Sequence, residues 1–265
     1  MKRYKFIIAF LFISTLIDAQ ILNTDRISAF SDSTTQKKLY TLLQFGLVID
    51  DQINTVIIYN GKADLSYFIG KHSIILVGKL SKTTSDEFEI INTAYTHLRF
   101  MLNKDEKSSP EFFTQYQYDK VRGMLDRYLL GSNIKYRLYK TKNGTMHLAT
   151  GFMYESERWN YHSVPDDKIP ANPEDVTTSL IKSNTYVKFN QKITENVDLG
   201  FITYYQGVPG NDFFKPRLSS TLEFNMQFSK KLSFVFQLET MYDYKVVVPV
   251  KSFYYILSNS ISIQL

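Results

Sequence analysis

The sequence predicts an all-β protein: an antiparallel up-and-down β-barrel of about twelve strands that spans an outer membrane. Three observations lead to this prediction. Apolar and polar residues alternate with a period of two from about residue 38 onward, as in strands with one apolar and one polar face. The alternating stretches run for roughly 10 to 16 residues, longer than usual soluble strands and long enough for a tilted bilayer crossing. The first twenty residues carry an export signal.

The composition bounds the class of protein. The chain has 265 residues, a net charge of +5, 20 Phe, 19 Tyr and no Cys. This length suits one large β domain, and aromatic residues favour strands. Without Cys there are no disulfides, thiolate nucleophiles, Cys-based metal sites or N-terminal lipid attachment. The basic excess is too small and too scattered to indicate a nucleic-acid partner.

The N-terminus has the order of a secretory signal peptide. Lys2, Arg3 and Lys5 precede the apolar run 6–17, and Asp18-Ala19-Gln20 follows it. A membrane anchor is the alternative, but the run is shorter than the roughly 20 residues of a spanning helix. We therefore expect a signal peptide at 1–19, a periplasmic extension at 20–37 and a transmembrane barrel at 38–265.

Each strand is expected where alternation is sustained. The expected strands lie at about 39–49, 57–67, 73–82, 88–100, 110–119, 127–139, 146–155, 181–189, 197–205, 221–228, 232–239 and 255–265. Pro110 sits at a strand start, where its missing N–H matters least. No stretch has a helical pattern. The only long interruption, 160–176, contains three prolines and several acidic residues.

Alternation alone does not say which face is wet, because a soluble barrel buries its apolar face and a membrane barrel turns it to lipid. Four features favour the membrane: the strand length, the even strand number, the alternation of short and long connections, and tyrosines near strand ends. The chain ends on Leu265 rather than on the aromatic residue frequent in such barrels. A soluble periplasmic β-barrel binding module remains the alternative.

Three segments carry a family resemblance: QINTVIIYNGKADLSY (52–67), FFTQYQYDKVRGMLDRYLLGSNIKYRLY (112–139) and GFMYESERW (151–159). The chain resembles the domain of unknown function 481 family, which includes proteins described as salt-induced outer-membrane proteins. The resemblance covers about 39–265 and implies an outer-membrane barrel with no established activity and no catalytic residues. The family usually has a Gly-Asn-Thr-like turn after the first strand. This sequence differs there, because Ile53-Asn54-Thr55 lacks the glycine.

Projecting the alternation inward predicts a charged lumen. The predicted lumen network consists of Lys62, Asp64, Glu89, Arg99, Gln115, Gln117, Arg127, Lys135, Arg137, Glu155, Arg217, Glu223 and Glu239, and the same projection adds Lys79, Lys182, Lys188 and Asp243. One interpretation is a packed ion-pair network that fills the barrel. The other is a narrow pore whose basic excess favours anions, with Arg127, Lys135 and Arg137 on one face of one strand. Twelve strands do not decide between them by diameter alone.

Catalysis is not indicated. A nucleophile needs a base oriented by a third group, and none of His72, His97, His147 and His162 precedes a Ser by two residues on a strand. No His, Asp and Glu set has metal-ligand spacing, and no cofactor is expected. The acids of 160–176 could bind cations or an external partner, but a solvated loop is the simpler interpretation.

The predicted function is therefore a non-enzymatic outer-membrane barrel of a Gram-negative bacterium, structural or a scaffold, or a largely closed pore. Its expected partners are outer-membrane lipid, the barrel-assembly machinery during insertion, and small ions or solutes if the lumen conducts. A narrow anion-leaning channel is the alternative. We further predict that Phe224 and Phe236 face lipid and that Glu223 and Glu239 face the lumen.

Overall fold

The computed structural model describes residues 39–51, 54–229 and 231–264. The expected signal peptide 1–19 and extension 20–37 lie outside the described residues, as does Ile53 in the first turn. The described chain is almost entirely strand, with one short 3-10 helix, η1 (Asp166–Lys168). The strands are β1 (Leu39–Asp51), β2 (Thr55–Ile69), β3 (His72–Ser85), β4 (Phe88–Met101), β5 (Ser108–Asp119), β6 (Met124–Lys140), β7 (Gly144–Trp159), β8 (Val176–Thr194), β9 (Val197–Gly207), β10 (Arg217–Gln227), β11 (Leu232–Asp243) and β12 (Phe253–Gln264).

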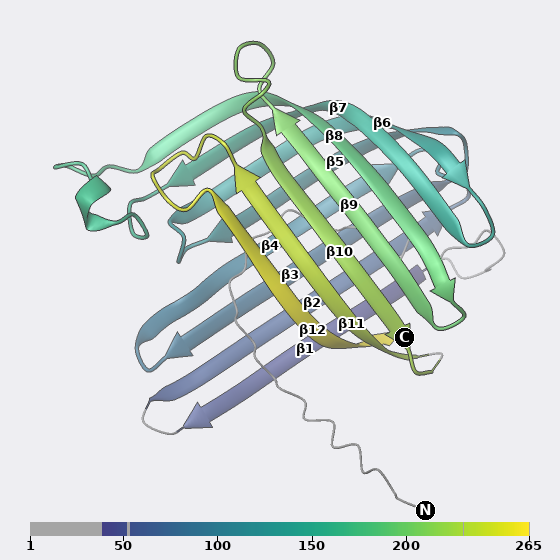
Figure 1. Cartoon of the computed structure of the whole chain (residues 1–265), viewed down its shortest axis with the longest axis horizontal. Helices are drawn as coiled ribbons and strands as arrows, with labels where there is room; N and C mark the ends of the chain where they lie inside the picture. The colour runs from purple at the N-terminus through teal and green to yellow at the C-terminus, as the bar shows by residue number, and fades with distance from the viewer. Residues whose placement is uncertain (1–38, 52–53, 230, 265) are drawn as a thin grey trace, which may run out of the picture.

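The strands form one antiparallel up-and-down barrel, as the alternation predicts (Figure 1). Every strand pairs with its neighbours in the chain, and β1 pairs with β12 to close the sheet. Tight turns set the register: Gly70 adopts a φ of 55° between β2 and β3, a conformation that glycine tolerates without a steric penalty. Pairing between neighbouring strands is the condition for crossing a bilayer with strands, because hydrocarbon offers unpaired backbone groups no hydrogen bonds.

The two ends of the barrel differ. The connections at one end are short: 70–71, 102–107, 141–143, 195–196 and 228–231. The other end carries 160–175, 208–216 and 244–252, and we call it the long-loop end (Figure 1). This asymmetry is the one expected of periplasmic turns and external loops.

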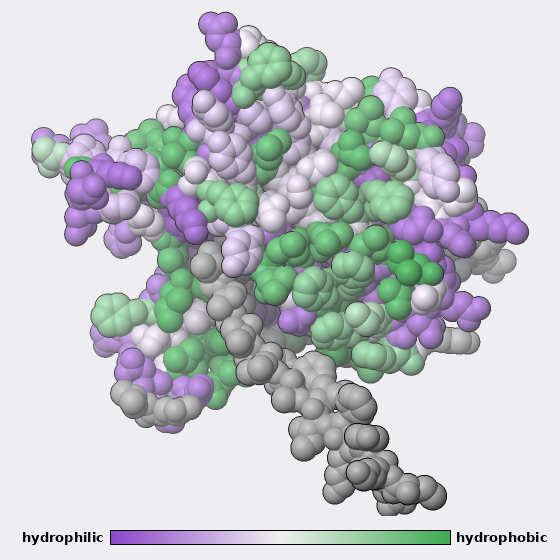
Figure 2. All heavy atoms as spheres, viewed as in Figure 1, coloured by the Kyte–Doolittle hydropathy of each residue, from purple (hydrophilic) through white to green (hydrophobic). Residues whose placement is uncertain are grey.

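The faces of the strands are inverted relative to a soluble barrel. Large apolar residues such as Leu130, Phe152 and Ile181 are exposed, whereas charged residues such as Arg127 and Glu155 are buried. Hydrophobic side chains cover much of the strand surface in Figure 2, and hydrophilic ones gather near the strand ends. Buried polar groups also meet across the barrel from strands that are not neighbours, so the polar face lines the lumen. Among the described residues, no helix is long and apolar enough to cross a membrane.

One predicted lumen residue lies elsewhere. The β3–β4 register shifts between Thr83 and Thr84, so that Ile91 opposes Thr83 and Glu89 opposes Thr84. A bulge inserts a residue and reverses the alternation beyond it. Glu89 is therefore exposed and pairs with Lys82 at 2.9 Å, which corrects the expectation that it faces the lumen.

The closure between β1 and β12 is short. Among the described residues these strands pair only at Leu42–Gln264 and Leu43–Ile263, whereas β1 pairs with β2 along its whole length. We call the remaining interval, β1 residues 44–51 facing β12 residues 255–262, the seam. On the left of Figure 1, the end of the purple β1 and the start of the yellow β12 lie far apart.

Candidate functional site: a charged cluster that fills the lumen

Five buried side chains and one half-buried aspartate form a cluster in the lumen, and we call these six residues the central cluster. They come from five strands and comprise Arg127 (β6), Glu155 and Glu157 (β7), Lys182 (β8), Arg217 (β10) and Asp243 (β11). Alternation along each strand aims these residues inward, and the antiparallel register brings them to one level.

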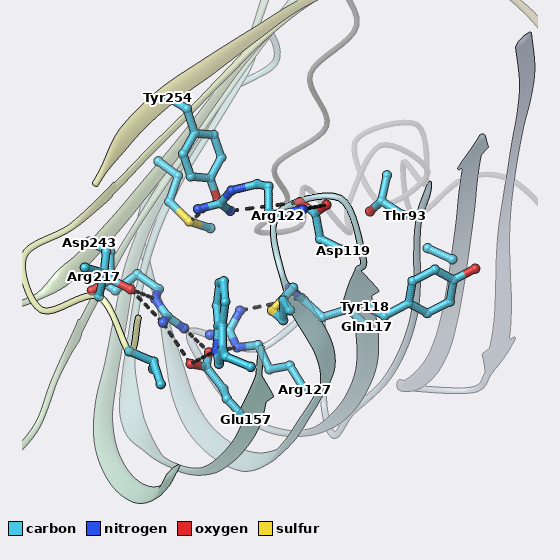
Figure 3. Close-up of a pocket in the computed structure, with 16 residues that line it drawn as sticks. Thr93, Gln117, Tyr118, Asp119, Arg122, Arg127, Glu157, Arg217, Asp243 and Tyr254 are labelled. Carbon is cyan, nitrogen blue, oxygen red and sulfur yellow. Dashed lines mark hydrogen bonds and ion pairs between the residues drawn. The ribbon is translucent and has the colours of Figure 1, made fainter. Parts of the chain in front are cut away.

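Arg217 holds three carboxylates together. Its Nη1 lies 3.0 Å from Glu155 Oε2, its Nη2 donates to Glu157 Oε2 at 3.2 Å, and its Nη2 lies 2.7 Å from Asp243 Oδ2. Figure 3 shows Arg217 between Asp243 and Glu157. A planar guanidinium with five donors suits this role, because it satisfies several carboxylates at fixed angles.

The second guanidinium completes the network from the opposite side. Arg127 Nε lies 2.8 Å from Glu157 Oε1 and donates to Glu155 Oε2 at 3.0 Å. Lys182 also forms an ion pair with Glu155. The three cations of the cluster thus balance its three carboxylates, and a buried network of this kind is tolerated only when its charges are paired.

Amide side chains extend the cluster. Arg127 donates to Gln117 Oε1 at 3.5 Å and to Gln206 Oε1 at 3.4 Å. Gln115 donates to Gln117 and lies 3.0 Å from His97 Nδ1. His97 therefore belongs to a polar chain inside the lumen.

A second layer lies closer to the short-turn end. Tyr186 donates to Glu111 Oε2 at 2.7 Å, and Lys135 Nζ lies 3.5 Å from Glu111 Oε1. Arg99 reaches across the barrel to Tyr204 at 3.4 Å and lies over the Tyr186 ring at 5.6 Å. Hydrogen bonds from β4 to β9 and from β5 to β8 span the lumen here.

The mouth at the long-loop end is covered by a hydrophobic cap, which consists of Met124, Trp159, Val164 and Val248. Val248 comes from the β11–β12 connection and is only 1% exposed. Beside the cap, Arg122 donates to the Tyr254 hydroxyl at 2.6 Å, with its guanidinium 3.9 Å from the ring centre (Figure 3). A cavity of about 20 Å³ lies beside the cap and is lined by Met124, Trp159 and Arg217 among others.

The comparisons with known proteins bear on this barrel. A family model described as "Protein of unknown function, DUF481" matches residues 54–249. The chain belongs to this family. This confirms the resemblance found in the sequence. A search of curated proteins found no match.

Two solved structures are similar to this DUF481 protein. The translocator domain of autotransporter NalP from Neisseria meningitidis is 10% identical with a TM-score of 0.47, over 90% of this chain and 92% of that one. A NanC porin is 10% identical with a TM-score of 0.42, over 85% of this chain and 97% of that one.

The structure brings most of the predicted network together, but not as one unit. Gln117, Arg127, Glu155 and Arg217 meet in or beside the central cluster, and Arg99 and Lys135 meet in the second layer. Near the seam, Lys62 lies 3.4 Å from Asp64, and Glu239 lies 3.9 Å from Lys79. Glu223 is buried on β10. Arg137 lies at the short-turn end, where it donates to the Asp105 carbonyl at 2.8 Å.

Several residues of the site were missed in the sequence. Glu157 and Glu111 follow the same alternation as Glu155 and Gln115, so extending the pattern by one or two steps would have found them. Arg122 and Val248 lie in connections, where alternation carries no information. Only tertiary contact shows that they close the mouth.

The chemistry available in this lumen is charge pairing and hydrogen bonding. Within residues 39–51, 54–229 and 231–264, no group of three or more His, Asp or Glu residues is placed to hold a metal ion. The cations and carboxylates of the central cluster contact each other, and the arrangement places paired charges in the lumen beside β6 to β11.

Proposed function

We propose that this DUF481 protein is an outer-membrane barrel whose lumen is closed at rest, and that it serves as a structural element or scaffold. One observation carries the proposal: large apolar side chains are exposed on the outer face, while charged side chains are buried inside and paired. In water such exposed surface would be unfavourable, whereas lipid accommodates it.

The outer face supports a membrane location in more detail. Its charged residues lie near strand ends, as with Lys82 and Glu89 beside the β3–β4 turn and Arg158 near the end of β7. Tyrosines gather toward the long-loop end of the outer face: Tyr59, Tyr116, Tyr128, Tyr154 and Tyr255. Such rings suit the boundary between hydrocarbon and water.

The closed lumen is favoured over an anion channel, because the basic residues that would select anions already contact acidic or carbonyl groups of the protein. Arg127 pairs with two glutamates, Lys135 pairs with Glu111, and Arg137 binds a backbone carbonyl at the short-turn end. These three side chains therefore contact groups of the protein itself, and the hydrophobic cap covers the mouth. Passage of a hydrated anion would require breaking several buried ion pairs.

The remaining features of the proposal follow from the barrel. No catalytic activity or cofactor is proposed. The partners are outer-membrane lipid and, during insertion, the barrel-assembly machinery of a Gram-negative bacterium. Export would use the predicted signal peptide at 1–19.

Cell fractionation with heat-modifiable gel migration tests this proposal. We expect the protein in the outer-membrane fraction, migrating faster before boiling than after it, because an intact barrel resists detergent. Recovery as a soluble periplasmic protein would contradict the proposal and favour a binding module.

A further inference from the structure

The short-turn end of the barrel carries an excess of positive charge. This end lies on the right of Figure 1, and Figure 2 shows hydrophilic side chains there beside the hydrophobic strand surface. Among the described residues, the exposed or half-buried cations within four residues of a short connection are Lys71, Lys104, Lys107, Arg137, Lys140, Lys142, Lys192 and Lys231. The corresponding acids are Asp105, Glu106, Glu195 and Asp198. This end thus has twice as many cations as acids.

Four of these cations lie together beside the end of β6, and we call Lys107, Arg137, Lys140 and Lys142 the basic patch. The backbone N–H of Arg137 donates to the Lys107 carbonyl at 2.8 Å, which holds the 102–107 connection next to β6. Lys140 is the last residue of β6, and Lys142 lies in the connection that follows. The basic patch therefore spans one strand end and the two connections beside it.

The acids nearest to the basic patch have other cationic partners. Asp105 lies 3.2 Å from Lys104, and Glu106 lies 3.7 Å from Lys71. Arg137 donates to the backbone carbonyl of Asp105, which carries no formal charge. In the part of the chain that the structure describes, no carboxylate forms an ion pair with any of the four cations. In contrast to the central cluster, where three cations meet three carboxylates, the basic patch keeps its positive charge at the surface.

The basic patch lies at the edge of the apolar outer face. Tyr136, Leu138 and Tyr139 are exposed on the last residues of β6 and are interleaved with cations of the patch. Tyrosines and lysines in this order suit a membrane boundary, because the rings lie among the headgroups and the ammonium groups extend toward the phosphates. The 141–143 connection is short, so the patch stays close to that boundary. An anion that meets the patch is therefore at the level of the lipid headgroups.

From this arrangement we infer that the basic patch binds the phosphate of an anionic phospholipid in the leaflet at the short-turn end. The phosphate oxygens would accept charge-assisted hydrogen bonds from the patch, and the acyl chains would lie against Tyr136, Leu138 and Tyr139. A zwitterionic phospholipid carries a cation of its own beside the phosphate, so its attraction to the patch is weaker. The site is separate from the central cluster. It rests on the proposed function, because only a barrel in a membrane has phospholipid beside β6.

Quenching of a tryptophan beside the basic patch measures lipid binding there. Tyr139→Trp supplies the reporter in nanodiscs of phosphatidylcholine, in which a small fraction of the lipid is phosphatidylglycerol with brominated chains. The native Trp159 is buried in the cap at the other end and gives a constant background. We expect brominated phosphatidylglycerol to quench at an about ten-fold lower mole fraction than brominated phosphatidylcholine. Tyr128→Trp, exposed on the same strand toward the long-loop end, is the matched reporter and should show no such preference.

Removal of the cations tests whether they select the lipid. In a Lys107→Gln, Lys140→Gln, Lys142→Gln variant of the Tyr139→Trp protein, phosphatidylglycerol should lose its advantage over phosphatidylcholine. All three lysines are exposed, so the barrel should fold as before, which heat-modifiable migration checks.

A control variant removes the same charge from the other end. Lys215→Gln, Lys245→Gln, Lys251→Gln changes three exposed lysines of the long loops and should keep the preference for phosphatidylglycerol. Glycerol 1-phosphate, which has the phosphate of the headgroup without acyl chains, should not reverse the quenching.

The outcomes separate the inference from the proposed function. In a barrel that shows heat-modifiable migration, equal quenching by the two brominated lipids or an equal loss of preference in the control variant would overturn the site. Reversal by glycerol 1-phosphate would also overturn it and would indicate a site for a soluble anion. Absence of quenching by either lipid would place this end of β6 outside the bilayer and overturn the site as well. Protein that fails to enter nanodiscs as a folded barrel would overturn both the proposed function and this site.

Discussion

The wall made of β5 to β11 and the wall made of β1 to β3 differ in what their inward faces contact. In the first wall, inward side chains meet partners from across the barrel, as Arg217 does with Glu155 and Glu157. In the second, inward side chains contact mainly their own or adjacent strands, as in the bond between Ser81 and Asn60. From Phe45 to Asp51, β1 is exposed on both faces.

The difference shows that two features of a barrel are independent: backbone pairing around the sheet and filling of the lumen by side chains. Backbone pairing runs around the sheet except at the seam, whereas most side chains that bridge distant strands lie on one side of the lumen. The filled side should be rigid because moving any strand would break buried ion pairs. The seam side should open more readily, because few contacts oppose the separation of β1 from β12.

The largest expected effect comes from removing a cation on the filled side. Arg217→Gln leaves Glu155, Glu157 and Asp243 with fewer partners, and breaking a buried network in this way costs about 3–5 kcal/mol. Lys62→Gln, near the seam, removes one ion pair and should cost about 1 kcal/mol. Denaturant unfolding in micelles measures both. Equal losses of unfolding free energy in the two variants would contradict the difference between the two walls.

The next largest loss of stability is expected from placing a charge on the outward face of the barrel. Phe224 packs against Phe236 with ring centres 6.3 Å apart, and it alternates with the buried Glu223. Phe224→Arg should cost about 2–4 kcal/mol near the bilayer midplane. Phe45→Arg on β1 should cost less, because at the seam the guanidinium can reach water. If Arg is tolerated at both 224 and 236 while Glu223→Leu and Glu239→Leu abolish folding, the assignment of the two faces is inverted.

Glycines probe the packing of the two walls directly. A Cβ at Gly151 on β7 would lie 2.0 Å from the Ser132 carbonyl oxygen and 2.7 Å from Asn133 Cα. At Gly61 on β2, a Cβ would meet no atom within 4 Å. We expect Gly151→Ala to destabilise by about 1–3 kcal/mol and Gly61→Ala to be neutral. Unfolding free energies of both variants check this, and a neutral Gly151→Ala would contradict the packing described for β7.

The smallest effect concerns the loops. Hydrogen bonds from Lys215 and Lys245 hold the pKa of Asp212 below its ordinary value. A lowered pKa means that the tie between 208–216 and 244–252 is complete at neutral pH and is lost as the pH falls through that lowered value. Limited digestion by an acid protease across a pH series should show 244–252 becoming more susceptible at the acid end. In Asp212→Asn this pH dependence should vanish.

Much of the fold could be predicted because strand alternation is a local property. It correctly identified the twelve strands, the difference between the two ends, and the inward positions of Arg127, Glu155 and Arg217. It failed at Glu89, because a bulge depends on the neighbouring strand. It also could not anticipate the seam or the insertion of Val248 into the mouth, because both depend on how distant segments meet in space.

The central claim is that paired charges and the hydrophobic cap close the lumen. Planar-bilayer recording of the purified protein tests it most directly. We predict no stable conductance, because the cations of the central cluster are paired and the hydrophobic cap lies over the mouth at the long-loop end. A stable, anion-selective conductance that falls in an Arg127→Gln, Arg137→Gln variant would contradict this account and establish a pore.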